Sequence, residues 1–241
     1  MIVIPMAGLS SRFFKAGYKL PKYMLDAYGE SLFDHSVKSF QQYFSSEKFV
    51  FIVRDVYGTP EFVKQRVIAL DIQDYDIVVL NTETRGQAET VSLGLANYRS
   101  SNEPITIFNI DTFRPNFIHP ELSKLGDGYL EVFRGEGTNW SFVRPINENS
   151  TQVDLTTEKN PISDLCCTGL YHFSNAQDFF SAYDYYLSLP KDKWEKGELY
   201  IAPLYNYLIS TTALVHYHEI PLEDVIFCGT PDEYTQFLQS K

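Results

Sequence analysis

The chain has 241 residues, of which 44% are hydrophobic and 21% charged, a composition typical of folded globular proteins. It carries 20 basic and 31 acidic side chains, a formal net charge of −11, so we expect neither nucleic acid nor a membrane as a partner. No apolar run is long enough for a membrane span, and the three cysteines form no disulfide framework, which predicts a reduced, cytoplasmic protein.

The first half of the sequence alternates short apolar runs with amphipathic stretches. Strands are predicted at 1–6, 48–54, 76–80 and 104–110, and helices at 31–44, 61–70 and 88–97. Strands that alternate with helices imply parallel pairing through helical crossovers, so we expect a Rossmann-like, three-layer, doubly wound α/β fold. Ligands of such folds bind beyond the carboxyl ends of the strands, where the polar loops 7–22, 81–87 and 111–114 are predicted.

After residue 116 the pattern favours strands joined by turns. Strands are predicted at 129–133, 141–145, 152–156, 170–173, 214–220 and 225–227, and helices at 175–187, at 199–210 and from 231 onward. No Gly/Ser-rich or Pro-rich linker interrupts the chain. We therefore predict a single domain of residues 1–241 with a mixed sheet.

A loop that follows the first predicted strand has the composition of a phosphate-binding loop. It contains Ala7, Gly8, Leu9, Ser10, Ser11 and Arg12. Small residues allow backbone N–H groups to approach phosphate oxygens, and an arginine adds a bidentate cation. The loop matches neither the GxGxxG nor the GK[ST] pattern, and an ordinary polar turn is the alternative.

Two further charged residues stand where a phosphate site would need them. Lys22 follows Pro21, whose fixed φ angle stiffens the backbone that presents the lysine; a solvated surface lysine is the alternative. Asp111 ends an apolar strand, where a carboxylate is a natural Mg²⁺ ligand; an aspartate that begins a turn is the alternative.

These segments resemble, in their order, the NDP-sugar pyrophosphorylase and nucleotidyltransferase family, which includes cytidylyltransferases for non-sugar phosphates. Three of them are PMAGLSSR at 5–12, Pro21-Lys22, and FNID at 108–111. The further similar segments are TRGQAETV at 84–91, EKNP at 158–161, CTGLYHF at 167–173, GELYIAPLYNYLI at 197–209 and FCGTPDEY at 227–234. Each motif is weak by itself, but together they span nearly the whole chain.

The resemblance implies an enzyme that transfers NMP from an NTP to a phosphorylated acceptor and releases pyrophosphate. It implies a nucleotide-binding half at 1–115 and an acceptor-binding half at 116–241. The loop 8–12, which ends in Arg12, would hold the β- and γ-phosphates, and Ala7 would also contact the nucleotide. Lys22 would neutralise the charge that grows on the α-phosphate, and Asp111 would hold Mg²⁺. Arg12, Lys22 and Asp111 are the implied catalytic residues.

The remaining implied roles concern the nucleobase and the acceptor. Gly86 and Gln87 would contact the nucleotide, with the Gln87 amide reading the base. The implied acceptor-binding residues are Ser141, Glu158, Lys159, Gly169 and Tyr200; Tyr171 and Tyr205 are further candidates for that pocket. The acceptor would be a sugar phosphate or a small non-sugar phosphate, for surface polysaccharide or capsule precursors, and assembly as a homo-oligomer stays open.

Two positions depart from the family pattern. Phe227 stands where family members commonly carry a second metal aspartate, so either one carboxylate suffices or Asp224 or Asp232 substitutes. Ser141 stands where the sugar enzymes usually have a glycine, and its side chain would narrow the acceptor pocket.

Two other classes of protein share features of this sequence. A noncatalytic nucleotide-binding regulatory domain would not need Arg12, Lys22 and Asp111 together. A glycosyltransferase would carry an Asp-x-Asp motif after the central strand, and Asp111 stands alone there. The alternating pair His216 and His218 lacks a third ligand nearby, so packing or surface roles are favoured over a metal site.

Overall fold

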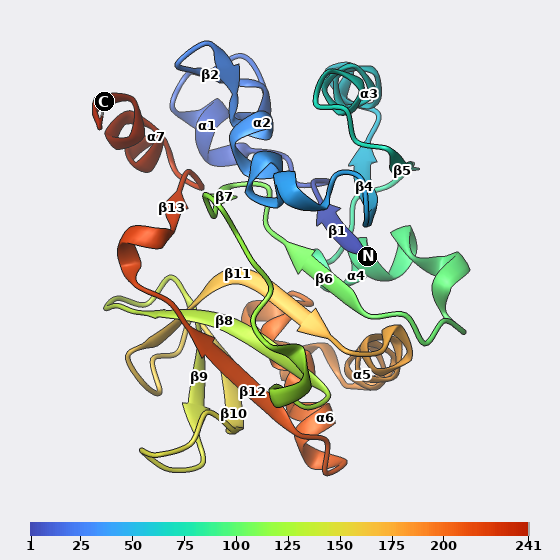
Figure 1. Cartoon of the computed structure of the whole chain (residues 1–241), viewed down its shortest axis with the longest axis vertical. Coiled ribbons are helices and arrows are strands. Elements are labelled where there is room, and N and C mark those ends of the chain that lie inside the picture. Colours follow the sequence, from blue (N-terminus) through green and yellow to red (C-terminus); the bar gives the residue numbers. More distant parts are fainter. Residues whose placement is uncertain (241) are drawn as a thin grey trace. The chain divides into compact units, whose positions relative to one another are not determined.

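The structure is a computed structural model that describes residues 1–240, and these residues form two compact units. The Asp111 unit comprises Ile2–Thr82, Phe108–Ile118 and the chain from Glu223 onward. The Glu158 unit comprises Met1, Glu83–Ile107 and His119–Leu222. Each unit therefore combines segments that are far apart in the sequence (Figure 1).

The Asp111 unit is built around three parallel strands in the order β1-β4-β5. The strands are β1 (Ile2–Pro5), β4 (Lys48–Arg54) and β5 (Asp74–Leu80), with two short antiparallel pairs, β2 (Asp26–Ala27) with β3 (Glu30–Ser31), and β7 (Thr112–Phe113) with β13 (Ile226–Phe227). Its helices are α1 (Ser11–Lys15), α2 (Leu32–Val37), α3 (Thr59–Ala69) and α7 (Pro231–Gln239). Because α3 lies between the parallel strands β4 and β5 in sequence, the predicted helical crossover is confirmed.

The Glu158 unit is mainly antiparallel. Its strands include β8 (Gly128–Arg134), β9 (Ser141–Pro145), β10 (Val153–Glu158), β11 (Leu165–Phe173) and β12 (Val215–Glu219), and β6 (Ile105–Phe108) enters it as far as Ile107. The order is β10-β9-β11-β6, while β8 pairs with β11 and, in parallel, with β12 (Figure 1). The helices are α4 (Gln87–Gly94), α5 (Ala176–Ser188) and α6 (Tyr205–Ser210). Parallel and antiparallel strands together confirm the predicted mixed α/β fold.

Two predicted helices are shorter than expected. The helix predicted at 31–44 is α-helical only as α2, and 3₁₀ turns follow at Lys38–Tyr43 with Phe40 at φ −102°, ψ 22°. Phe40 is fully buried and its ring lies 4.9 Å from that of Phe108, so core packing decides the local backbone here. The helix predicted at 199–210 is α-helical only as α6, because Pro203 has no backbone N–H to donate.

The loop predicted at 7–22 contains one short helix, α1, and ends in a 3₁₀ turn at Lys22–Met24. The strand predicted at 170–173 is longer than expected, because β11 begins at Leu165 and includes the buried, free thiols of Cys166 and Cys167. The boundary predicted between residues 115 and 116 stays a prediction.

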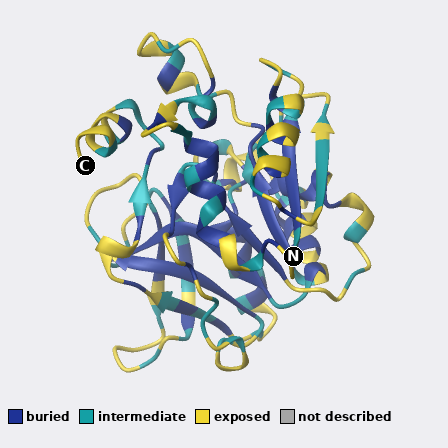
Figure 2. Ribbon diagram, turned by 45° about the horizontal axis from the view of Figure 1, so that its top comes forward, coloured by how far each residue is buried: buried dark blue, intermediate teal, exposed yellow. Residues whose placement is uncertain are grey.

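Apolar side chains fill the interior of each unit. Figure 2 shows the central strands as buried and the connecting loops as largely exposed. In the Asp111 unit, one cluster is formed by Phe13, Ala27, Leu32, Phe113, Cys228 and Tyr234. This cluster joins α1 and α7 to the β7–β13 pair, which fixes the backbone that surrounds Asp111. Within residues 1–240, no helix has both the length and the apolar character that a membrane span requires.

Candidate active site

The loop after β1 presents exposed backbone at Gly8. A Cβ atom added at Gly8 would meet no other atom within 4 Å, so the space in front of this residue is open. Ser10 adopts a left-handed conformation with φ 50°, and its Oγ accepts a hydrogen bond of 3.1 Å from the backbone N–H of Lys22. The loop is therefore tied directly to the Pro21-Lys22 segment.

Lys22 and Asp111 are 89 residues apart in sequence and form an ion pair in the Asp111 unit. The Lys22 Nζ lies 2.5 Å from Asp111 Oδ2, and the two side chains are 21% and 24% exposed. Pro21, with φ −55°, precedes Lys22, and Asp111 stands between β6 and β7. Lys22 thus begins a 3₁₀ turn and Asp111 lies in a turn between two strands, and both side chains stay partly exposed to a ligand.

The charges around Asp111 favour its ionised form. Burial acts to raise the pKa of the Asp111 carboxyl, but the Lys22 ammonium, with a smaller contribution from Arg12, holds this pKa below its ordinary value. Arg12 itself is exposed. The structure therefore brings the three predicted catalytic residues into one electrostatic cluster with two cations and one anion.

The β7–β13 pair makes room for the Asp111 carboxylate. The backbone N–H of Cys228 donates a 2.8 Å hydrogen bond to the Asp111 carbonyl, which places Gly229 beside the aspartate. A Cβ atom at Gly229 would lie 2.8 Å from Asp111 Oδ2, closer than side chains tolerate. A glycine at this position therefore allows the carboxylate its observed orientation.

A single, partly exposed carboxylate such as that of Asp111 suits Mg²⁺, which is commonly held by one or two carboxylates together with substrate phosphates. Among residues 1–240, no group of three histidine, cysteine, aspartate or glutamate side chains is arranged to hold a metal. Phe227 lies in β13 opposite Thr112, and both Asp224 and Asp232 are exposed. The ligand role of Asp111 and the choice between those two aspartates stay predictions.

The Glu158 unit contains a second cluster of polar groups. Ser141 and Glu158 are directly opposite each other in the β9–β10 pair, and the Ser141 hydroxyl donates a hydrogen bond to Glu158 Oε2. Both residues are buried, with exposed fractions of 8% and 6%. Burial raises the pKa of the Glu158 carboxyl above its usual value, while the Ser141 hydroxyl and the Lys159 ammonium oppose this shift.

Lys159 follows Glu158 in a left-handed conformation, with φ 54°. Its Nζ donates a 2.6 Å hydrogen bond to the Tyr200 hydroxyl, lies 4.6 Å from the centre of the Tyr200 ring, and is 3.9 Å from Glu158 Oε1. The ammonium group therefore lies against the neutral Tyr200 side chain and 3.9 Å from the Glu158 carboxylate. An anion that binds Lys159 would have to compete with these two groups.

Gly86 and Gln87 lie where α4 begins. Gly86 has φ 146°, and a Cβ atom there would lie 2.6 Å from the Leu199 nitrogen, so only glycine fits. Leu199 also exchanges backbone hydrogen bonds of 2.9 Å with Arg85 and Ala88 on either side. This arrangement holds Gln87, a half-buried residue, at the start of the helix; its contact with a base stays a prediction.

The other candidate residues of the acceptor pocket differ in their surroundings. Gly169, with φ 97°, lies at a bulge in β11, and beyond it the hydroxyl of Tyr171 lies 3.4 Å from Ser141 Oγ. Tyr205 is fully buried and donates a 2.8 Å hydrogen bond to the His172 carbonyl, so its expected exposure to an acceptor is wrong. The apolar surroundings of Tyr205 explain this: its ring stacks on Phe173 at 4.4 Å.

The chain resembles one solved structure over its full length. It is 58% identical to the nucleoside-diphosphate-sugar pyrophosphorylase from Vibrio cholerae RC9, covers 100% of both chains, and superposes with a TM-score of 0.95. The chain belongs to the nucleoside-diphosphate-sugar pyrophosphorylase family of nucleotidyltransferases. A scan against protein-family models and a search of curated proteins find no match.

More distant nucleotidyltransferases share the fold at low identity. A UDP-glucose pyrophosphorylase complexed with UDP-glucose is 14% identical, with a TM-score of 0.74 over 99% of this chain and 97% of that one. The inositol-1-phosphate CTP transferase from T. maritima is 15% identical, with a TM-score of 0.72 over 99% of this chain and 94% of that one. These likenesses show the fold alone.

Sequence reasoning missed several residues that shape this nucleotidyltransferase. Gly229, which admits the Asp111 carboxylate, was noted only as part of a motif. The link from Ser10 to Lys22 depends on loop geometry that no local pattern specifies. A detectable signal existed at the start of α7: the spacing of Thr230 and Glu233 is that of a capping box, which the structure contains.

Proposed function

We propose that this nucleotidyltransferase transfers NMP from an NTP to a phosphorylated acceptor in a Mg²⁺-dependent reaction. An oxygen of the acceptor's phosphate attacks the α-phosphorus of the NTP, a new P–O bond forms, and the bond to the bridging oxygen breaks to release pyrophosphate. Such transfers need positioning and charge neutralisation more than covalent help from the protein. The observation that supports this proposal is the ion pair of Lys22 with Asp111, whose carboxyl is also influenced by the charge of Arg12.

In the proposed reaction, Arg12 and the exposed backbone of Gly8 bind the β- and γ-phosphates. Lys22 turns from Asp111 toward the α-phosphate and neutralises the negative charge that grows there. When bound, Mg²⁺ would supply a second positive charge on the same phosphate, and Asp111 is the residue that would hold it. The net charge of −11 makes these local cations necessary for binding an anionic substrate.

The acceptor side of the proposal rests on the Glu158 unit. Glu158 accepts hydrogen bonds from hydroxyl or ammonium groups of the acceptor, and Lys159 leaves Tyr200 to pair with the acceptor's phosphate. The acceptor is a sugar phosphate or a small non-sugar phosphate. An NDP-linked product of this kind would serve as an activated precursor for surface polysaccharide or capsule.

Pyrophosphate release tests this function. ATP, CTP, GTP and UTP would each be combined with hexose 1-phosphates and with phosphorylated amino alcohols and polyols, with Mg²⁺ present or chelated by EDTA. We expect release with one preferred pair, and its loss in EDTA. The absence of release from every pair, or undiminished release in EDTA, would contradict the proposal.

A further inference from the structure

Strand register places the Ser141 hydroxyl beside Glu158 and Tyr171. In the β9–β10 pair Ser141 is opposite Glu158, and its hydroxyl donates to Glu158 Oε2. On its other side, Tyr171 from β11 brings its hydroxyl to 3.4 Å. Because all three residues are buried, water does not compete freely for these contacts.

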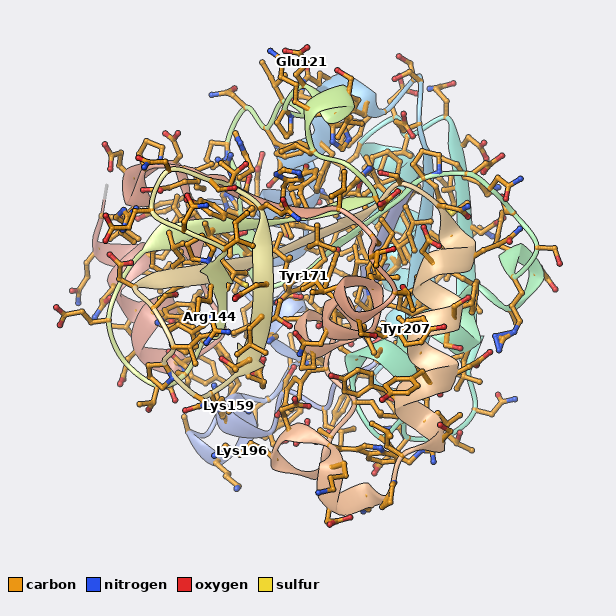
Figure 3. All side chains as sticks on the ribbon, turned by 90° about the horizontal axis from the view of Figure 1, so that it is seen from below. Glu121, Arg144, Lys159, Tyr171, Lys196 and Tyr207 are labelled. Atoms are coloured by element: carbon orange, nitrogen blue, oxygen red, sulfur yellow. The ribbon has the colours of Figure 1, made fainter. Side chains whose placement is uncertain are left out.

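The two oxygens of Glu158 are consequently unequal. Oε2 is engaged by Ser141, whereas the nearest cation to Oε1 is the Lys159 Nζ, at 3.9 Å, beyond hydrogen-bond distance. Lys159 is in turn bonded to Tyr200. Figure 3 labels Lys159 and Tyr171, two members of this set of contacts. Oε1 is therefore the oxygen that is available for a hydrogen bond from a ligand.

Several charged or titratable groups surround the Glu158 carboxyl. From β9 and β11 it interacts with Ser141, which also lies near the Tyr171 hydroxyl, and with the buried Cys167 thiol. Lys159, Tyr200, Glu195 and Glu198 act on it from other segments. Burial raises the pKa of this carboxyl, and Glu195 and Glu198 raise it further; Ser141 and Lys159 lower it. Removing the serine hydroxyl therefore takes away a group that favours the ionised form.

We propose that Ser141 is a positioning residue: its hydroxyl fixes the Glu158 carboxylate so that Oε1 accepts one hydrogen bond from a hydroxyl or ammonium group of the acceptor. This inference rests on the proposed function and adds a specificity determinant to it. The hydroxymethyl group also occupies space beside Glu158 that a glycine would leave open. Ser141 thus selects acceptors with a single donor directed at Glu158 over bulkier ones.

The first test measures Glu158 without any substrate. Glutamate side-chain carboxyl carbons are labelled with ¹³C and titrated by NMR in the wild-type protein, with E158Q identifying the resonance. In S141A we expect the midpoint for Glu158 to move to higher pH, and in S141T, which keeps a hydroxyl group, to return toward the wild-type midpoint. V143A, at a buried position two residues along β9, is the packing control and should leave this midpoint in place.

The second test uses the acceptor identified by pyrophosphate release. In S141A the KM for the acceptor should rise about tenfold, as expected for one lost hydrogen bond to a charged group, with kcat changed less. The acid limb of kcat/KM should move to higher pH, and S141G should accept bulkier acceptors better than S141A does.

The two tests separate this inference from the proposed function. A Glu158 midpoint that is the same in S141A and wild type, or an unchanged acceptor KM in S141A, would overturn the role of Ser141. Failure to find any acceptor would contradict the proposed function, while the NMR titration would still decide whether Ser141 controls Glu158. If S141A does not fold, S141G and S141T give the same comparison.

Discussion

Gly8 occupies a position where the structure has room for a larger side chain. The backbone φ of Gly8 is not positive, and an added Cβ would contact nothing within 4 Å. The glycine is therefore not required by the fold. The proposed binding of a phosphate against this backbone would account for it instead.

Gly8→Ala should leave stability within about 0.5 kcal/mol of wild type but raise the KM for the NTP about tenfold, because the new methyl group displaces phosphate oxygens from the backbone N–H groups. Thermal unfolding of the ligand-free protein is the control. An unchanged KM for the NTP would exclude this loop from phosphate binding.

The ionised Glu158 carboxylate that the proposed function needs is expected to lower the stability of the folded protein. Burial raises the pKa of this carboxyl, so the folded protein is destabilised by its ionisation at neutral pH. E158Q keeps the shape and removes the charge. We expect E158Q to raise Tm at pH 8 by about 2–4 °C, the shift that ~1 kcal/mol produces in a chain of this size.

The stability difference between E158Q and wild type depends on pH, and calorimetry can measure this dependence. A carboxyl whose pKa is raised by folding contributes stability below its unfolded pKa, and this contribution is lost as pH rises through the folded pKa. The advantage of E158Q should therefore shrink as pH falls through the folded pKa of Glu158. An advantage that grows on acidification would show that Glu158 is stabilised in its ionised form.

Among the elements, the short β7–β13 pair matters most for the candidate site. It joins the backbone after Asp111 to that before Gly229, two segments that are distant in the sequence. Gly229→Ala should displace the Asp111 carboxylate, because the new Cβ would lie 2.8 Å from Oδ2, and should lower kcat more than tenfold.

The matched control for Gly229→Ala is the same substitution in an Asp111→Asn background. There it should cause little further loss of kcat, because the group it displaces is already impaired. An equal loss in both backgrounds would mean that Gly229 acts through some contact other than Asp111.

The elements also show how far the sequence could lead. Buried strands such as 48–54 and 141–145 were predicted at their observed bounds, because a continuous or alternating apolar run between turns is a strong local signal. The break at Phe40 and the register that places Ser141 opposite Glu158 were not predicted, since both depend on contacts with other segments. The convergence of Lys22 with Asp111 was predicted from the topology, which places the loops 7–22 and 111–114 beyond the carboxyl ends of the strands, whereas their roles at a phosphate came from the family resemblance.

At the scale of the whole molecule, the candidate site residues include several cations although the chain is acidic overall. A chain with a net charge of −11 concentrates Arg12 and Lys22 near one carboxylate in the Asp111 unit, and Lys159 beside Tyr200 in the Glu158 unit. Since an acidic surface repels polyphosphates in general, the proposed function requires these local cations where the substrates bind. The fold persists in nucleotidyltransferases at 14% and 15% identity, so the fold by itself does not specify the acceptor.

In the proposed reaction, Lys22 and Asp111 act together on one triphosphate. A double-mutant cycle with K22A, D111N and K22A/D111N, followed by pyrophosphate release at saturating NTP and acceptor, tests it most directly. We predict that each single variant loses about 10²–10³-fold in kcat and that the double variant loses little more, as for residues that act as one unit. Losses that multiply in the double variant, or near-normal turnover in either single one, would contradict the account.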